Sequence, residues 1–171
     1  MNIVFKGWRW FITKLGDIYF ATEPPKVHAK DIRKLNTLLL PGDVVCRRYI
    51  YYLDTYLIPG KYSHSGIVVD GETMVHAVAE GVDYIDVMDF VKDSDGFILL
   101  RPPANAQATI DFARRQVGKP YDFLFDKTTK DAIYCHELSY FSLLAGGMII
   151  KAGKRIYADD LIRVCDIILE V

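Results

Sequence analysis

Residues 62–82 read YSHSGIVVDGETMVHAVAEGV, two Val-rich runs on either side of Asp70 and Gly71. Alternating apolar and polar residues are typical of half-buried strands, and an Asp-Gly pair between two such runs is typical of a β-hairpin. The stretch therefore predicts a hairpin. Each of its strands carries one histidine, His64 in the first and His76 in the second.

The length of the hairpin loop decides whether the two histidines meet, and a two-residue loop separates them. If only residues 70 and 71 form the turn, His64 lies opposite Ala77. Side chains alternate between the two faces of a strand, so His76 would then lie on the other face of the sheet.

A three-residue loop over residues 70–72 brings the histidines together. His64 then lies opposite Val78, and His76 becomes its diagonal neighbour on the same face, roughly 7 Å away between backbones. Glu80 occupies the other diagonal position. The register therefore allows either His76 or Glu80 to orient His64, and the sequence leaves both loop lengths open.

The rest of the chain places strands in the middle and helices at the flanks, which indicates an α+β fold with a central antiparallel sheet packed against helices. No repeat or long linker divides the chain, so we expect one domain over residues 1–171, with residues 1–38 as a helical extension of a core at 39–171. Further strands are expected at 43–50, 82–87, 96–102 and the C-terminus, and helices at the N-terminus, 29–39, 105–117 and from Cys135 onward.

Composition narrows the functional classes. The chain has 21 Lys and Arg against 22 Asp and Glu, a formal net charge of -1, so we expect no nucleic-acid partner. Cys46, Cys135 and Cys165 are widely spaced without a CxxC pair, which argues against a disulfide framework or a thiolate zinc site. Because no secretory signal or membrane-spanning run is evident, we expect a cytoplasmic protein.

The first twenty residues, MNIVFKGWRWFITKLGDIYF, mix basic and apolar side chains. We expect an amphipathic helix packed on the domain. The alternative is a helix that makes weak contact with a membrane surface, with Trp8, Trp10 and Phe11 at the interface.

Cys135 lies in AIYCHELSYF, residues 132–141, where a helical pattern begins directly after an apolar trio. Free backbone amides and the positive end of the helix dipole lower the pKa of a thiol at a helix start, so we expect a populated thiolate near neutral pH. Cys46 and Cys165 lie in apolar strand patterns and are expected in the core. The position of Cys135 therefore favours a nucleophile.

A cysteine nucleophile needs a general base, usually a histidine that a third group orients. His28 lies in a basic, polar stretch and is expected in solvent. His136 is adjacent to Cys135 but points about 100° away from it on a helix, so it is badly placed to accept the thiol proton. His64 and His76 remain, and their shared face in one register makes them the candidates.

Five segments carry a family resemblance: LLPGDVV, YSHSGIVV, VHAV, GKPYDFLF and YCHEL, in that order. Over roughly residues 39–146 the chain resembles the circularly permuted papain-like proteins of the NlpC class, in particular the YiiX-like group, with lecithin retinol acyltransferase as a more distant relative. The resemblance implies a papain-like fold in which the strand with the base precedes the helix with the nucleophile.

The resemblance also implies roles for individual residues. Cys135 matches the nucleophile and His64 the base, and His76 stands at the position of the polar third residue, with Glu80 as the alternative. Tyr121 of the PYD segment matches a residue that lines the cleft near the oxyanion. His136 departs from the family pattern, because relatives commonly have a small hydroxyl residue there.

We therefore expect a thiol hydrolase or acyltransferase that acts on a peptide, amide or lipid-acyl substrate and needs no cofactor. The aromatic stretch from Tyr49 to Tyr56 suits an apolar substrate. Two alternatives stay open: a noncatalytic binding module that keeps the fold, and a zinc site formed by His64, His76 and Cys135.

Overall fold

A computed structural model describes residues 3–16, 23–50 and 58–171 of the chain. Within these residues most strands lie in the middle of the chain and most helices toward its ends, as in an α+β fold. In order they are α1 (Ile3–Gly16), α2 (Ala29–Leu38), β1 (Val44–Arg48), β2 (His64–Val68), β3 (Thr73–Val78), β4 (Gly81–Asp86), α3 (Val87–Val91), β5 (Gly96–Arg101), α4 (Ala106–Arg115), α5 (Cys135–Ala145), α6 (Ala158–Ile162) and β6 (Asp166–Glu170).

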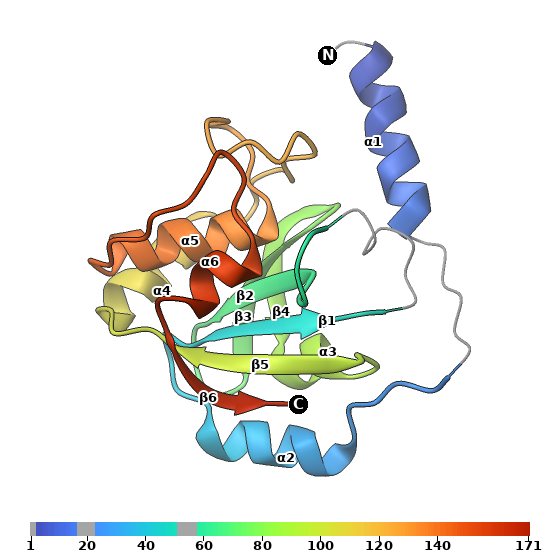
Figure 1. The fold of residues 1–171 in the computed structure, drawn as a ribbon. Helices are drawn as coiled ribbons and strands as arrows, with labels where there is room; N and C mark the ends of the chain where they lie inside the picture. The colour runs from blue at the N-terminus through green and yellow to red at the C-terminus, as the bar shows by residue number, and fades with distance from the viewer. Residues whose placement is uncertain (1–2, 17–22, 51–57) are drawn as a thin grey trace.

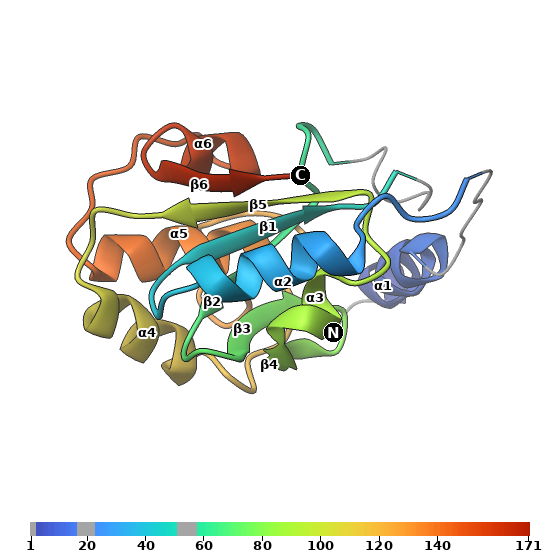
Figure 2. The ribbon, with the colours of Figure 1, turned by 90° about the horizontal axis from the view of Figure 1, so that it is seen from below.

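The described strands form one six-stranded sheet in the order β4-β3-β2-β1-β5-β6. All neighbouring strands are antiparallel. Figure 1 shows α5 and α6 above this sheet and α2 below it, and Figure 2 gives the view from the side of α2. The predicted α+β class with a central antiparallel sheet and helices packed against it is confirmed.

Side-chain alternation along the strands builds a separate core on each face of the sheet. In β1, Val44 and Cys46 join the core under α4, α5 and α6, whereas Val45 joins the core under α2 and α3. Cys46 is fully buried, as predicted. Leu35 of α2 is also fully buried in the second core, so part of the expected N-terminal extension packs on the sheet.

The hairpin between β2 and β3 has the three-residue loop. Gly66 pairs with His76, and the amide of Val69 donates to the carbonyl of Thr73, which leaves residues 70–72 as the turn. The Asp70 carboxylate accepts hydrogen bonds from the amides of Glu72 and Thr73, at 3.0 and 2.7 Å. An aspartate that caps its own turn in this way stabilises the longer loop and places both histidines on one face.

Cys135 is the first residue of α5, as predicted. The helix starts there because the Glu137 carboxylate accepts a hydrogen bond from the amide of Tyr134, at 3.3 Å, and so stabilises the residue before the helix. Leu138 and Leu143 are fully buried and hold α5 against the sheet. The start of the helix is therefore held close to the strands that carry the histidines.

One local expectation, for Cys165, was wrong. Cys165 lies in the turn before β6 and is half-buried, not part of a strand in the core. Residues 158–162, which carry no predicted element, form the short helix α6. In α4 the buried residues are Thr109, Ile110 and Ala113.

Candidate active site

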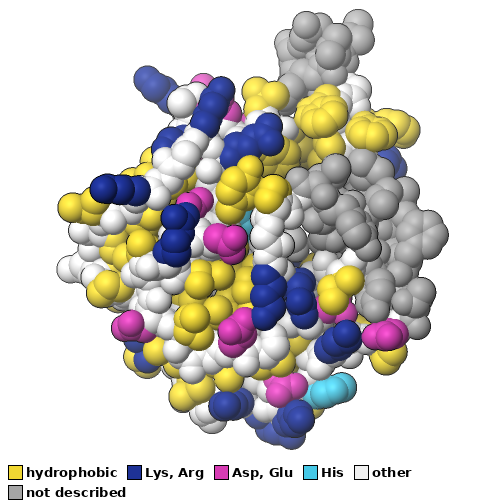
Figure 3. Space-filling view, viewed as in Figure 1, with side chains coloured by type: hydrophobic (Ala, Val, Ile, Leu, Met, Phe, Trp, Pro, Cys, Tyr) yellow, Lys and Arg dark blue, Asp and Glu magenta, His cyan; other side chains and the backbone are white. Residues whose placement is uncertain are grey.

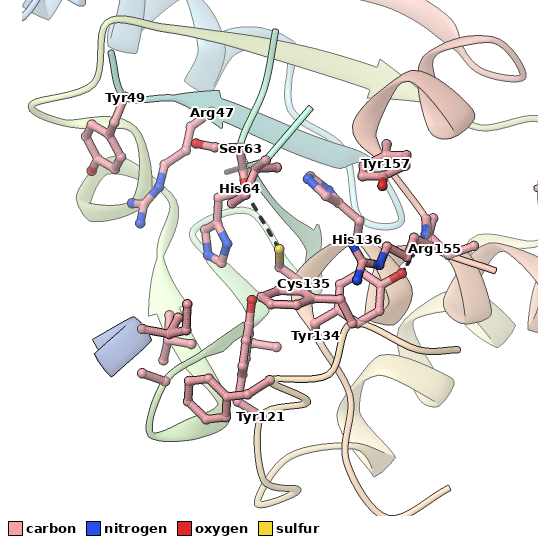
Figure 4. A pocket seen from close by; sticks show the side chains of 18 of the residues that line it. Arg47, Tyr49, Ser63, His64, Tyr121, Tyr134, Cys135, His136, Arg155 and Tyr157 are labelled. Atoms are coloured by element: carbon pink, nitrogen blue, oxygen red, sulfur yellow. Dashed lines mark hydrogen bonds between the residues drawn. The ribbon is translucent and has the colours of Figure 1, made fainter. Parts of the chain in front are cut away.

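A cavity of about 440 Å³ lies where the start of α5 meets the beginning of β2 and the end of β3. Its walls include Cys135 and His64, together with Tyr121 from the loop before α5. Figure 4 shows the side chains of these three residues around one space. Segments seventy positions apart in the sequence thus meet at a single site.

The Cys135 side chain is in the cavity wall but is only 3 % exposed. Its sulfur lies 3.9 Å from the carbonyl oxygen of Ser63. Burial raises the pKa of the thiol to about 11, although the amides of Ser65 and His136 and the Tyr121 hydroxyl act in the opposite direction. The predicted low pKa is therefore wrong: the helix start does favour the thiolate, but the cost of desolvating a charge is larger.

The two histidines of the hairpin form a hydrogen-bonded pair. Nε2 of His64 lies 3.2 Å from Nδ1 of His76, and their rings meet edge to face. His76 stands directly across from Gly66. Because Gly66 has no side chain, the His64 ring can reach diagonally across to its partner on the next strand.

Phe90 and Arg47 complete the surroundings of this histidine pair. The His64 ring stacks on the buried ring of Phe90, and the Arg47 guanidinium lies over the same phenylalanine ring, 4.4 Å from its centroid. Arg47 also pairs with His64 across β1 and β2 and donates to the carbonyl of Phe90. A fixed positive charge therefore lies next to both imidazoles.

Burial and this positive charge keep both histidines neutral. Burial lowers the pKa of His64 well below its ordinary value, and Arg47, His76 and His136 lower it further. The pKa of His76 falls to about 4, mainly through burial and then through Arg47, while Asp83 on β4 has a smaller, opposite effect. Near neutral pH the site thus holds an uncharged thiol and uncharged imidazoles.

Glu80, the alternative third residue, lies in the turn after β3 and is exposed. It lines the cavity, but the hydrogen bond that orients His64 goes to His76. Of the two orienting groups that the register allowed, His76 is therefore the one that contacts His64 in the structure.

Tyr121 is half-buried and its ring packs edge to face on Phe123 and Phe125. Figure 4 shows its hydroxyl directed toward Cys135. A hydrogen bond from this hydroxyl is one of the groups that lower the pKa of the thiol, which fits a position beside the reacting sulfur.

His136 points away from its neighbour's sulfur, as helix geometry predicted. Its Nδ1 is 2.8 Å from the hydroxyl of Ser65, which is itself 2.9 Å from the hydroxyl of Ser139. Its Nε2 is buried and has no hydrogen-bond partner among the described residues. Burial lowers the pKa of His136 to about 4, so this side chain is neutral and anchors β2 to α5.

Sequence reasoning missed several residues of the cavity. Arg47 is placed by the pairing of β1 with β2, which no local pattern reveals. Ile12 and Thr13 of α1 and Arg155 of the loop before α6 also line the cavity. Tyr49, the first residue of the predicted aromatic wall, lines it too; residues 51–57 of that stretch lie outside the described residues.

The zinc alternative does not fit the site. Over the described ranges, no group of three or more His, Cys, Asp or Glu side chains is arranged to hold a metal ion. His64 and His76 direct nitrogens at each other at hydrogen-bonding distance, so those two atoms are not available to a common metal.

Comparison with known proteins connects the chain to a family. The model of a family described as permuted papain-like amidase enzyme, YaeF/YiiX, C92 family, matches residues 39–161. The structure is similar to the crystal structure of metalloprotein yiiX from Escherichia coli O157:H7, with a TM-score of 0.58 and 22 % identity over 67 % of this chain and 71 % of that one. No curated protein matched the chain. The predicted permuted papain-like fold is confirmed.

Proposed function

Because the chain belongs to the family of permuted papain-like amidases of the YaeF/YiiX type, we propose that it is a cysteine-dependent hydrolase that cleaves an amide or ester through a thiol acyl-enzyme. One observation carries this proposal. Cys135 and His64 line the same cavity, and a hydrogen bond to His76 holds the His64 ring in place.

The hydrogen bond between the histidines assigns a role to each ring nitrogen. Since Nε2 of His64 is engaged by Nδ1 of His76, we assign proton transfer to Nδ1 of His64. Nδ1 of neutral His64 can accept a proton only if the ring carries its own proton on Nε2. That Nε2–H then donates to Nδ1 of His76. His76 is then the positioning residue that keeps His64 in the tautomer able to accept a proton.

The reaction follows from these assignments. Nδ1 of His64 takes the thiol proton of Cys135 as the sulfur attacks the carbonyl carbon and forms a carbon–sulfur bond. The same nitrogen then gives that proton to the leaving amine or alcohol as its bond to the carbonyl carbon breaks. Water, deprotonated by His64, attacks the thioester, and the carboxylic acid leaves while the thiol regains its proton.

The neutral resting state determines the type of catalysis. With the pKa of Cys135 near 11 and that of His64 well below its ordinary value, a preformed thiolate–imidazolium pair is not the resting form near neutral pH. The proton must therefore move during the attack, as in general-base catalysis. When a substrate carbonyl is bound, proton transfer from the Cys135 thiol to His64 can accompany the attack of the sulfur on the carbonyl carbon.

Two donors are placed to stabilise the oxyanion. The backbone amide of Cys135 lies at the free start of α5, where the helix dipole favours negative charge. The Tyr121 hydroxyl is directed toward Cys135. We propose that both donate to the carbonyl oxygen as it becomes negatively charged.

The cavity wall suits a substrate with an apolar part. Side chains that surround the polar groups include Phe123, Phe125 and Ile156. A lipid-acyl chain and the apolar side chain of a peptide both fit this description, so the proposed substrate class is an amide or ester with an apolar acyl group.

A noncatalytic binding module is the second candidate, and the raised pKa of Cys135 favours it. Alkylation of the free thiol cannot separate the two candidates, because a thiol with this pKa reacts slowly near neutral pH in either case. Formation of an acyl-enzyme separates them directly. It requires the nucleophile, the base and the oxyanion donors together.

The test is mass spectrometry of the protein mixed with a panel of activated esters and amides, including a fatty-acyl ester and a muropeptide. A hydrolase gains the acyl mass on Cys135 in a burst, and neither Cys135→Ala nor His64→Ala shows the burst. Cys46→Ala is the matched control, because that thiol is buried away from the cavity, and it keeps the burst. Turnover that survives in Cys135→Ala contradicts the proposal.

A further inference from the structure

The helix α1 has an outward surface that combines aromatic and basic side chains. Trp10 is 64 % exposed and Phe11 is 48 % exposed, and Lys6 is exposed beside them. Figure 3 shows hydrophobic side chains gathered on the molecular surface over α1. Large aromatic side chains exposed together are typical of an interaction surface.

The opposite side of α1 is held at the cavity. Nε1 of Trp8 donates to the carbonyl of Phe123 at 3.1 Å, and the Arg9 guanidinium lies over the ring of the same phenylalanine, 5.5 Å from its centroid. Ile12 and Thr13 line the cavity itself. One side of α1 therefore lines the cavity, and the other side exposes Trp10 and Phe11 to solvent.

Charge identifies the kind of surface that α1 would contact. Its fourteen residues include Lys6, Arg9 and Lys14 and no acidic residue, although the whole chain carries a net charge of -1. A short helix with tryptophan, phenylalanine and interspersed basic residues is the type that lies in the headgroup region of an anionic bilayer. No described helix is long and apolar enough to cross a membrane, so contact along the surface is the mode that fits.

We propose that α1 docks the protein on an anionic phospholipid surface through Trp10 and Phe11, together with the exposed Lys6 and Lys14. The contacts of Trp8 and Ile12 then hold the cavity next to the docked helix. This docking does not depend on catalysis by Cys135, so the test measures binding alone.

The tryptophans make the helix directly observable. The chain has two tryptophans, Trp8 and Trp10, and both lie in α1, so intrinsic tryptophan fluorescence reports on this helix alone. We expect the emission of the Trp8→Phe variant, which retains Trp10, to shift to shorter wavelength with vesicles that contain phosphatidylglycerol. Vesicles of phosphatidylcholine alone should give little shift, and high salt should reverse the shift.

Matched variants locate the contact in co-sedimentation with the same vesicles. Lys6→Glu should weaken binding by about tenfold or more, since each basic residue near an anionic surface contributes about fivefold. Lys30→Glu, at an exposed site on α2 on the far side of the sheet, should bind like the wild type. Trp10→Asp should likewise lose binding, whereas Ile149→Asp, at a residue 90 % exposed after α5, should not.

The proposal is overturned if vesicles containing phosphatidylglycerol give neither a fluorescence shift nor co-sedimentation. It is also overturned if Lys6→Glu and Lys30→Glu weaken binding equally, or if Lys6→Glu changes only the oligomeric state. Vesicle binding by Cys135→Ala at wild-type strength would support docking even if no substrate were found, which keeps this test separate from the proposed hydrolysis.

Discussion

His76 lies across from Gly66 in the hairpin, and its Nδ1 is 3.2 Å from Nε2 of His64. A neutral histidine pair joined in this way has one donor and one acceptor, so the tautomer of one ring determines that of the other. In the proposed mechanism this link keeps Nδ1 of His64 free to accept a proton.

Replacing His76 tests the positioning role. His76→Leu removes the acceptor for Nε2 of His64, and we expect kcat to fall about 10²-fold with little change in KM. His76→Asn offers an amide oxygen near the former Nδ1 and should restore part of kcat. Steady-state kinetics of both variants measures this difference, and equal losses would argue against orientation by hydrogen bonding.

Arg47 should determine the acid limb of the pH–rate profile. Its charge lowers the pKa of both His64 and His76, and a protonated His64 cannot act as the base. Arg47→Met should therefore raise the pKa of both imidazoles and move the acid limb of kcat/KM to higher pH. Arg47→Lys keeps the charge and should leave the limb close to its wild-type position; an unmoved limb in Arg47→Met would contradict this role.

Tyr121→Phe should reduce kcat by about tenfold to a hundredfold, because it removes one proposed donor to the oxyanion. Stability should change little, since the side chain is half-buried and the ring contacts with Phe123 remain. Tyr157→Phe, in another tyrosine of the cavity wall, is the control. Similar losses in both variants would point to a general effect on the cavity and not to the oxyanion.

Gly66→Ala should disturb the histidine pair. A Cβ at this position would lie 2.7 Å from Cε of Met74 and 2.8 Å from the carbonyl oxygen of Val75. We expect a loss of about 1–3 kcal/mol in the free energy of unfolding and a lower kcat. Gly71→Ala, where no atom lies within 4 Å, should change neither quantity appreciably; denaturant unfolding of both variants provides the comparison.

Stability should depend on pH through His136 and, in the opposite direction, Glu137. Burial lowers the pKa of His136 from 6.5 to about 4. Its contribution to the free energy of unfolding is therefore complete above pH 6.5 and is lost as the pH falls toward 4. Burial raises the pKa of Glu137 from 4.5 to about 7. Its contribution to the free energy of unfolding is therefore complete below pH 4.5 and is lost as the pH rises through 7.

Two variants separate these opposing effects. His136→Asn should reduce the loss of stability between pH 6.5 and 4 by roughly 1–3 kcal/mol, because the variant has no imidazole to protonate. Glu137→Gln should enlarge that loss, because it removes the contribution that grows on acidification. Urea unfolding at both pH values measures the two changes, and an unchanged pH dependence in His136→Asn would show that His136 does not contribute.

Local sequence patterns were enough to predict the elements that carry the site. Alternating residues around Asp70 and Gly71 indicated the hairpin, and the start of a helical pattern indicated that Cys135 begins α5. These features follow from local periodicity and capping, which depend on near neighbours in the chain. Local patterns also limited the orienting group to His76 or Glu80.

The folded chain shows which loop length the hairpin adopts and which charges surround the site. Hydrogen bonds from Glu72 and Thr73 to the Asp70 carboxylate select the three-residue loop and thereby bring His76 to His64. Pairing of β1 with β2 places Arg47 beside the imidazoles, and packing of α5 buries Cys135. Desolvation and the fields of distant charges depend on the whole fold, so the pKa of this thiol could not be predicted from its position at a helix start.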